Sequence, residues 1–139
     1  MRQENAIYGG EMSAHHYFRD FGYNDSGMVP WLLVAGLMSF DQSLSAMVDY
    51  AMEAYPCSGE INYKIPHAKQ VIERIYNYFV KENPEIDETD GLSFSFEKWR
   101  FSLRSSNTEP VLRLNVESRG DTKLVSEKVR ELESIILES

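Results

Sequence analysis

The sequence predicts an α+β fold in which a small four-stranded antiparallel sheet carries two helices on one face. Two observations predict it. Apolar and polar residues alternate strictly in three segments of the second half of the chain, which is the period of strands with one buried face. On either side of these segments, apolar residues recur at helical spacing. The chain before residue 58 is different, because its pattern indicates polar loops followed by two helices.

The strands of this sheet are expected at residues 60–65, 92–97, 99–104 and 112–117. One helix is expected from about His67 to Lys81, and a second begins near Asp121, a residue type that caps helix N-termini well. Two such helices can cover the apolar face of an antiparallel sheet. The other face then carries three arginines, Arg100, Arg104 and Arg113. The acidic segment 82–91 is typical of a solvated loop.

The first part of the chain begins with two polar stretches, at residues 9–16 and 23–27. A helix is expected over residues 28–38, where Pro30 is tolerated in the first turn. A second helix runs from Ser43 to about Ala54 and ends before Pro56. Residues 55–59 then form a linker to the predicted sheet.

Composition limits the kinds of protein that this chain can be. A length of 139 residues with 42% hydrophobic residues allows one ordinary domain, or a small domain and a piece of another. The net charge of −8 opposes nonspecific binding to nucleic acid or to an anionic membrane. Cys57 is the only cysteine, so a reducing compartment is expected. With no apolar run long enough to span a bilayer and no signal-peptide pattern, we expect a soluble cytoplasmic protein.

The turn between the last two predicted strands has the composition of an oxyanion site. It runs from Arg104 to Pro110 and is almost free of apolar residues. A phosphate needs several converging donors, and this turn offers a guanidinium, hydroxyls and a carboxamide. Such residues are also what ordinary hairpin connections are made of. The presence of Arg104 at one strand end and Arg113 beyond the turn favours the phosphate site.

A second candidate site lies in the Gly-rich loop, where Glu11, Ser13 and His15 alternate behind two glycines. A carboxylate, a hydroxyl and an imidazole together suit a polyhydroxylated ligand such as a sugar. A metal site built from Glu11, His15 and His16 is less favoured, because adjacent histidines on an extended segment point to opposite faces. Taken alone, the loop is better explained as an exposed Gly-rich connection.

Both loops resemble motifs of one family, the α-D-phosphohexomutases. Residues 10–15, Gly-Glu-Met-Ser-Ala-His, resemble the sugar-binding loop of that family, and residues 104–114 resemble its phosphate-binding loop. Around these motifs, residues 9–18 and 99–118 are most similar to bacterial phosphomannomutases. The two motifs come in the right order, about ninety residues apart, which makes the match specific. The family usually has Gly where Ala14 stands.

This resemblance covers the chain but only the C-terminal part of the enzyme. It implies that residues 1–40 are the C-terminal remnant of the sugar-binding α/β domain and that residues 41–57 are a helix and linker. It implies further that residues 58–139 are the C-terminal phosphate-binding domain. The fold of that domain in the family is similar to that of the TATA-box-binding protein. It also implies a chain that is a fragment of a longer enzyme.

The activity implied by the resemblance is a reversible phosphate transfer between O1 and O6 of a hexose, which for a phosphomannomutase interconverts mannose 6-phosphate and mannose 1-phosphate and precedes GDP-mannose synthesis. By the same resemblance, Glu11, Ser13 and His15 bind or approach the sugar. The phosphate that is not transferred would be held by the residues of the other loop, Arg104, Ser106, Asn107 and Thr108.

The family's phosphoserine motif and its Asp-Gly-Asp-x-Asp-Arg magnesium loop are absent from the sequence, and Asp90-Gly91 is only a superficial echo of the latter. The resemblance assigns Mg²⁺ and a hexose 1,6-bisphosphate to the full-length parent. No catalytic residue, metal or cofactor is therefore expected in this chain, and the chain alone should be inactive, because phosphoryl transfer needs a positioned nucleophile and a charge-neutralising metal.

Three alternatives stay open at this point. The first is a stand-alone module that binds phosphate-bearing ligands. The second is part of a phosphoglucomutase, because mannose and glucose differ at O2 and contacts to the other hydroxyls do not distinguish the two sugars. A nucleic-acid-binding sheet is disfavoured, because the outward positions of residues 93–117 lack aromatic side chains and the net charge is negative.

Overall fold

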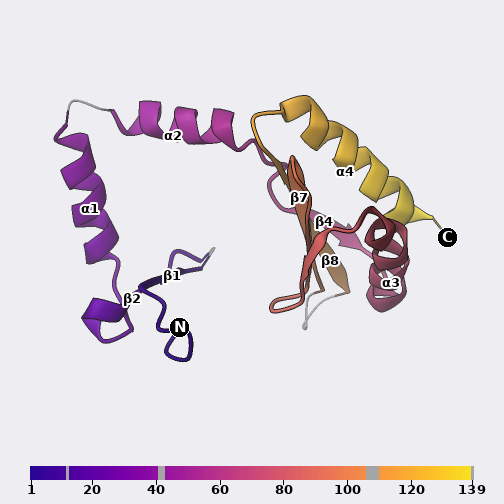
Figure 1. Cartoon of the computed structure of the whole chain (residues 1–139), viewed down its shortest axis with the longest axis horizontal. Coiled ribbons are helices and arrows are strands. Elements are labelled where there is room, and N and C mark those ends of the chain that lie inside the picture. The colour runs from indigo at the N-terminus through magenta and orange to yellow at the C-terminus, as the bar shows by residue number, and fades with distance from the viewer. Residues whose placement is uncertain (12, 41–42, 106–109, 139) are drawn as a thin grey trace. The chain divides into compact units, whose positions relative to one another are not determined.

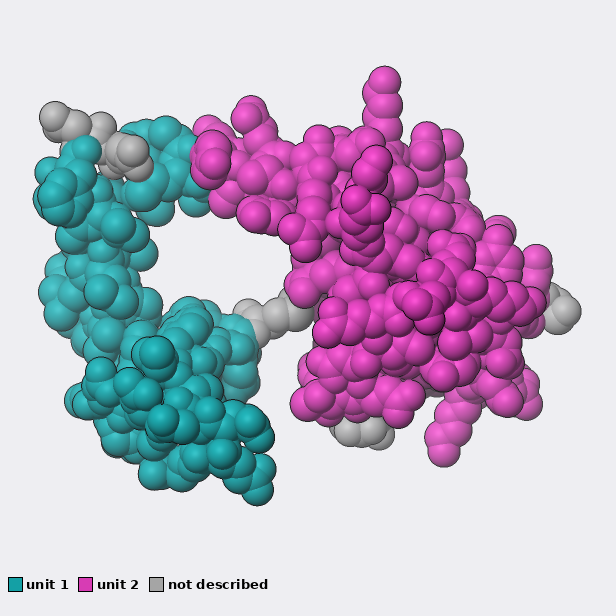
Figure 2. Space-filling model, in the orientation of Figure 1, with its two compact units in different colours: residues 1–48 teal, residues 49–139 magenta. Residues whose placement is uncertain are grey.

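The computed structural model describes residues 1–11, 13–40, 43–105 and 110–138. The chain divides into two compact units, residues 1–48 and 49–139, which Figure 2 colours separately. The boundary falls inside the helix α2 (Leu44–Ala54), so the linker expected at residues 55–59 belongs to the second unit. None of the helices in the described ranges has the length and apolar content that a bilayer crossing requires.

The first unit contains a small antiparallel sheet that the sequence did not predict. Its strands are β1 (Tyr8–Gly10), β2 (His16–Phe18) and β3 (Asn24–Asp25), in the order β1-β2-β3. A short 3-10 helix, η1 (Arg19–Phe21), connects β2 to β3. The Gly-rich stretch is therefore partly a strand, because Tyr8 pairs with Phe18 and Gly10 with His16 across the β1–β2 ladder.

The predicted helix over residues 28–38 is confirmed as α1 (Met28–Met38). It is apolar on all sides, and within the described chain none of its residues is buried. The helix expected from Ser43 is α2, and the Ser43 hydroxyl accepts a hydrogen bond from the Ala46 amide at 3.2 Å, as an N-cap does.

The second unit has the expected α+β architecture, but its sheet has five strands rather than four. The strand order is β4-β8-β7-β6-β5, all antiparallel. The strands are β4 (Ile61–Lys64), β5 (Glu85–Asp87), β6 (Leu92–Ser95), β7 (Trp99–Ser105) and β8 (Val111–Ser118). The fifth strand, β5, comes from the acidic segment that the sequence predicted to be a loop.

Two helices cover one face of this sheet, as expected (Figure 1). They are α3 (Ala68–Phe79), which continues into the 3-10 turn η2 (Val80–Glu82), and α4 (Thr122–Leu137). The Asp121 carboxylate accepts a hydrogen bond from the Leu124 amide at 3.0 Å, so the predicted N-cap is confirmed. The core between helices and sheet includes Phe79, Phe94 and Phe101, which are at most 1% exposed.

The alternation predicted for β7 and β8 is confirmed, and it sets the chemistry of the uncovered face. Trp99, Phe101 and Leu103 are buried, while Arg100 and Arg104 are exposed. The β7–β8 register places polar residues opposite one another on the uncovered face. Arg100 pairs with Glu117, Ser102 with Asn115, and Arg104 with Arg113. The rigid, aromatic-filled core therefore holds a polar sheet face in fixed geometry.

Candidate functional site

The Gly10–His15 loop connects β1 to β2 and is closed by backbone hydrogen bonds. The Glu11 amide donates to the His15 carbonyl at 2.9 Å, and the Ala14 amide donates to the Glu11 carbonyl at 3.0 Å. Ala14 has a φ of 63°, in the left-handed region that glycine adopts without strain. An alanine in this conformation is therefore more strained than a glycine would be.

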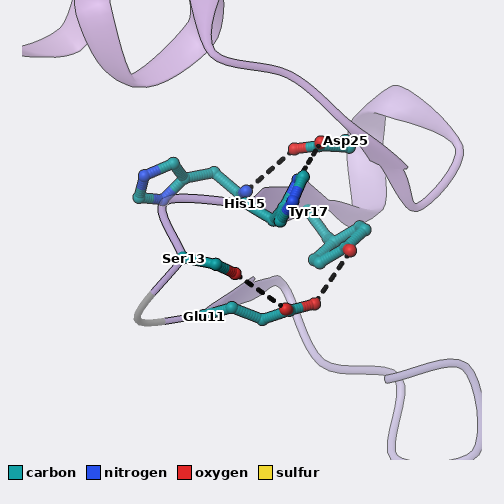
Figure 3. Close-up of polar contacts among 6 residues, drawn as sticks. Glu11, Ser13, His15, Tyr17 and Asp25 are labelled. Carbon is teal, nitrogen blue, oxygen red and sulfur yellow. Dashed lines mark hydrogen bonds and ion pairs between the residues drawn. The ribbon is translucent and has the colours of Figure 1, made fainter.

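Two of the three predicted sugar-loop residues lie together in this turn (Figure 3). The Ser13 hydroxyl donates to Glu11 Oε2 at 3.1 Å, and the Tyr17 hydroxyl donates to Glu11 Oε1 at 2.9 Å. The Glu11 carboxylate is thus held from both sides while Glu11 and Ser13 stay exposed. The hydrogen bond to Glu11 also raises the pKa of the Tyr17 phenol, because a deprotonated Tyr17 would place its negative charge beside the Glu11 carboxylate.

His15 is held by a partner that the sequence did not suggest. Its Nδ1 lies 2.6 Å from Asp25 Oδ2, and Asp25 Oδ1 accepts the His16 amide at 2.9 Å (Figure 3). This hydrogen bond and the charge of Asp25 raise the pKa of His15, while the same contact lowers the pKa of Asp25. His15 is therefore more readily protonated than a free histidine, and its Nε2 is the nitrogen left to face a ligand.

The two adjacent histidines have different partners, since the His16 Nδ1 lies 2.7 Å from the Tyr8 hydroxyl. Among the described residues, no three His, Cys, Asp or Glu side chains converge as metal ligands would.

The second candidate site begins at the end of β7. Arg104 and Ser105 are the last two residues of that strand, and both are exposed. The other predicted phosphate ligands, Ser106, Asn107 and Thr108, lie outside the described residues. Arg113 on β8 pairs directly with Arg104, so two guanidinium side chains leave the same face of the sheet next to each other.

Each of these arginines has a carboxylate partner. Arg104 Nη1 lies 3.2 Å from Asp90 Oδ2, and Arg113 Nη1 lies 3.6 Å from Glu60 Oε2. The Arg113 Nε is buried and, within the described residues, has no hydrogen-bond acceptor. The arrangement places positive charge and hydrogen-bond donors where an anion can reach them.

Sequence reasoning missed Tyr17, Asp25 and Asp90. Tyr17 and Asp25 lie in segments whose polar character was evident, but their partners follow only from the β1-β2-β3 register. Asp90 lies in the acidic segment that was predicted to be a solvated loop.

Both parts of the chain match models of one protein family. Residues 1–55 match phosphoglucomutase/phosphomannomutase alpha/beta/alpha domain III, and residues 60–134 match the phosphoglucomutase/phosphomannomutase C-terminal domain. The chain is a member of the phosphoglucomutase/phosphomannomutase family of phosphohexomutases. The resemblance seen in the two loop motifs is thereby confirmed.

Relatives in this family include phosphomannomutases. The chain is 54% identical over 138 residues to a phosphomannomutase of Vibrio cholerae and 58% identical over 137 residues to one of Salmonella typhimurium. It is 55% identical over 137 residues to a protein of Xanthomonas campestris pv. campestris described as phosphohexose mutases. Each alignment covers 98% of this chain but only 30% or 31% of the relative, so the chain spans about a third of their length.

A solved structure supports the fold. The phosphoglucomutase/phosphomannomutase family protein of Burkholderia thailandensis matches 99% of this chain and 30% of its own, with a TM-score of 0.69. At 22% sequence identity this likeness bears on the fold alone. It agrees with the α+β architecture of the second unit, in which five strands replace the predicted four.

Proposed function

We propose that this chain is the C-terminal part of a phosphomannomutase, which interconverts mannose 6-phosphate and mannose 1-phosphate in the cytoplasm and so supplies GDP-mannose synthesis. The observation that carries the proposal is the exposed Arg104 at the end of β7, paired across the ladder with Arg113. In a chain with a net charge of −8, these two arginines bring guanidinium donors together on one face of a rigid sheet, each beside a single carboxylate. The phosphomannomutase relatives, at 54% to 58% identity, supply the choice of sugar.

In this proposal the Arg104–Pro110 turn binds the phosphate that is not being transferred. Arg104 supplies a planar fork of N–H groups to two phosphate oxygens, and Ser106, Asn107 and Thr108 supply hydroxyl and amide donors. These groups recognise the tetrahedral phosphate dianion and not the sugar ring. The site can therefore hold either end of a sugar that turns over between two phosphate transfers.

The Gly10–His15 loop binds the sugar. The Glu11 carboxylate, already oriented by Ser13 and Tyr17, accepts hydrogen bonds from two neighbouring sugar hydroxyls, and Ser13 can donate and accept beside it. His15, held at Nδ1 by Asp25, offers its Nε2–H to a hydroxyl or phosphate oxygen. Because these groups are ordered before the ligand arrives, little rotamer freedom is lost on binding.

The remaining machinery belongs to the rest of the enzyme. We propose that residues 1–40 are a remnant of the sugar-binding domain, that residues 41–57 connect it, and that residues 58–139 are the phosphate-binding domain. In this proposal the phosphoserine, the Mg²⁺ site and the hexose 1,6-bisphosphate activation belong to the part of the full-length enzyme outside this chain, which spans about a third of its relatives. The 139-residue chain alone is then expected to bind hexose phosphates weakly and to turn none over.

A mutase assay on an enzyme that contains this chain tests the proposal. The change Arg104→Ala should lower kcat/KM for mannose 6-phosphate by roughly ten- to a hundredfold, because it removes charge-assisted hydrogen bonds to phosphate. Arg130→Ala on the exposed side of α4 is the matched control and should leave kcat/KM unchanged. Glucose 6-phosphate run in parallel reports the sugar preference.

Two results would overturn the proposal. One is turnover of mannose 6-phosphate by the purified 139-residue chain, since the missing nucleophile would then not be needed. The other is an Arg104→Ala enzyme as active as the Arg130→Ala control, which would remove Arg104 from the phosphate site.

A further inference from the structure

The feature that the proposed function leaves unused is the tip of the β5–β6 hairpin, residues 88–91. The tip is defined by register, because Asp87 pairs with Ser93 at the end of the β5–β6 ladder. The Asp87 carboxylate accepts the Thr89 amide at 2.8 Å, which tightens the turn after β5. On the other side, Leu92 pairs with Leu103, so the tip reaches the end of β7 where Arg104 lies.

Gly91 lets this tip approach the strand more closely than any other residue type would. Its φ is 86°, and a Cβ built on it would lie 2.4 Å from the Leu103 carbonyl oxygen and 3.3 Å from the Arg104 Cα. Both the backbone conformation and the lack of space therefore require glycine. As a result, the residue before it, Asp90, is fixed beside the backbone of Arg104.

Asp90 uses this position to contact the guanidinium. Its Oδ2 lies 3.2 Å from Arg104 Nη1, and the two side chains are 71% and 60% exposed, so a ligand can reach the pair. Arg104 also faces Arg113 directly across the β7–β8 ladder, where two cations repel. Glu60 pairs with Arg113 in the same way, so each arginine of the pair has its own carboxylate partner.

We propose that Asp90 is a positioning residue for phosphate binding by Arg104, an inference that rests on the proposed function of the Arg104–Pro110 turn. Asp90 acts on one nitrogen of the guanidinium and restricts its rotamers before the ligand arrives. A carboxylate oxygen takes one N–H, and a guanidinium carries several more in its planar fork. The phosphate then binds a side chain that has already lost part of its conformational freedom, so binding costs less entropy.

Competition predicts the opposite result, which makes the proposal testable. A carboxylate that merely occupied Arg104 would have to be displaced by phosphate, and its negative charge would repel the incoming dianion. Removal of Asp90 would then strengthen phosphate binding. If Asp90 positions Arg104, its removal weakens binding, although the substitution takes a negative charge away from an anion site.

The experiment titrates the isotope-labelled 139-residue chain with inorganic phosphate and with mannose 6-phosphate while following the Arg104 Nε–Hε resonance. Asp90→Ala should raise the Kd about three- to fivefold, as expected when part of the cost of ordering one long side chain is moved to the binding step. Asp90→Asn keeps a hydrogen-bond acceptor and should fall between Asp90→Ala and the unchanged chain. Without ligand, the Arg104 side chain should become measurably more mobile in Asp90→Ala only.

Glu88→Ala is the matched control, because it removes the same charge from the same hairpin tip, where no ion pair involves Glu88 among the described residues. It should not weaken phosphate binding. An Asp90→Ala chain that binds phosphate as tightly as the unchanged chain, or more tightly, overturns the role of Asp90 alone. An unchanged chain whose Arg104 resonance does not respond to phosphate overturns the phosphate site, and with it the role of Asp90.

Discussion

His15 and Asp25 show how a single contact orders a side chain of the candidate sugar-binding loop. The 2.6 Å contact fixes His15 Nδ1, and Asp25 also accepts the His16 amide, so one carboxylate holds both the ring and its backbone. Both side chains are exposed, so the contact serves to orient His15 and contributes little to overall stability. A ligand group at His15 therefore meets a ring of defined orientation.

The pKa shifts of this pair predict a pH window for the contact. The pKa of His15 is raised above its ordinary 6.5 and that of Asp25 is lowered below 3.8, so the charged pair is complete between those two shifted values. Its stabilisation is lost as the pH rises through the His15 pKa and as it falls through the Asp25 pKa. Hydrogen exchange of the His16 amide should accelerate outside this window by more than the intrinsic pH effect.

The change Asp25→Asn tests this directly, because it should return the pKa of His15 toward 6.5 in a titration followed by NMR. Asp20→Asn is the control, since Asp20 pairs with Arg19 instead. An Asp25→Asn chain with an unchanged His15 pKa would show that another group raises it.

The residues of the candidate sites were predictable from sequence only as far as their chemistry is local. Glu11 and Ser13 are two positions apart, and their hydrogen bond follows from that spacing in a turn. Asp25 reaches His15 only because β3 pairs with β2, and Asp90 reaches Arg104 only because β5 exists. No pattern within a short window encodes those two contacts.

β5 is the element whose prediction was wrong, and the cause is its position at the sheet edge. It has three residues and a single half-buried apolar side chain, Ile86, between two exposed acids. Alternation over so short a segment cannot be told from a polar loop, and acidic residues are common on edge strands, where they discourage pairing with other chains. β6, β7 and β8 were predicted correctly because each buries a full alternating face.

The β5–β6 hairpin gives a prediction for stability. Gly91→Ala should lower the free energy of unfolding by about 2–3 kcal/mol, since it adds a left-handed backbone penalty to a clash with the Leu103 carbonyl. Gly59→Ala is the matched control, because Gly59 has a φ of 68° but nothing within 4 Å of a built Cβ, and it should cost about 1 kcal/mol. Urea denaturation of both variants checks this, and equal losses would contradict the close approach of the hairpin tip.

At the level of the whole chain, the two units differ in how they bury apolar residues. The second unit has a closed core around Phe79 and Phe101, whereas α1 leaves Trp31, Leu32 and Leu37 between 55% and 61% exposed. A helix that is apolar on every side is normally buried on every side. Since the chain spans about a third of its relatives, we expect residues of a longer protein to cover α1.

The two tryptophans report on this difference, because Trp31 is 61% exposed and Trp99 is 7% exposed. In a Trp99→Phe chain, the remaining Trp31 should be quenched by acrylamide several times more efficiently than Trp99 is in a Trp31→Phe chain. Dilution should leave this ratio unchanged. A Trp31 as protected as Trp99 would mean that the 139-residue chain already covers α1, for example by self-association.

The central proposal is that each unit carries a binding loop of its own chemistry, residues 10–15 for the sugar and the strand end at Arg104 and Ser105 for the phosphate. An amide-shift titration with mannose 6-phosphate, run beside mannose and inorganic phosphate, tests it most directly. We predict millimolar binding, about 4 kcal/mol, in which phosphate moves Arg104 and Ser105, mannose moves Glu11 and Ser13, and mannose 6-phosphate moves both sets. Micromolar binding would favour a stand-alone module. Two results would contradict the claim. Mannose 6-phosphate could shift the amide resonances of neither loop, or it could shift those of Arg104 and Ser105 while those of Glu11 and Ser13 do not change.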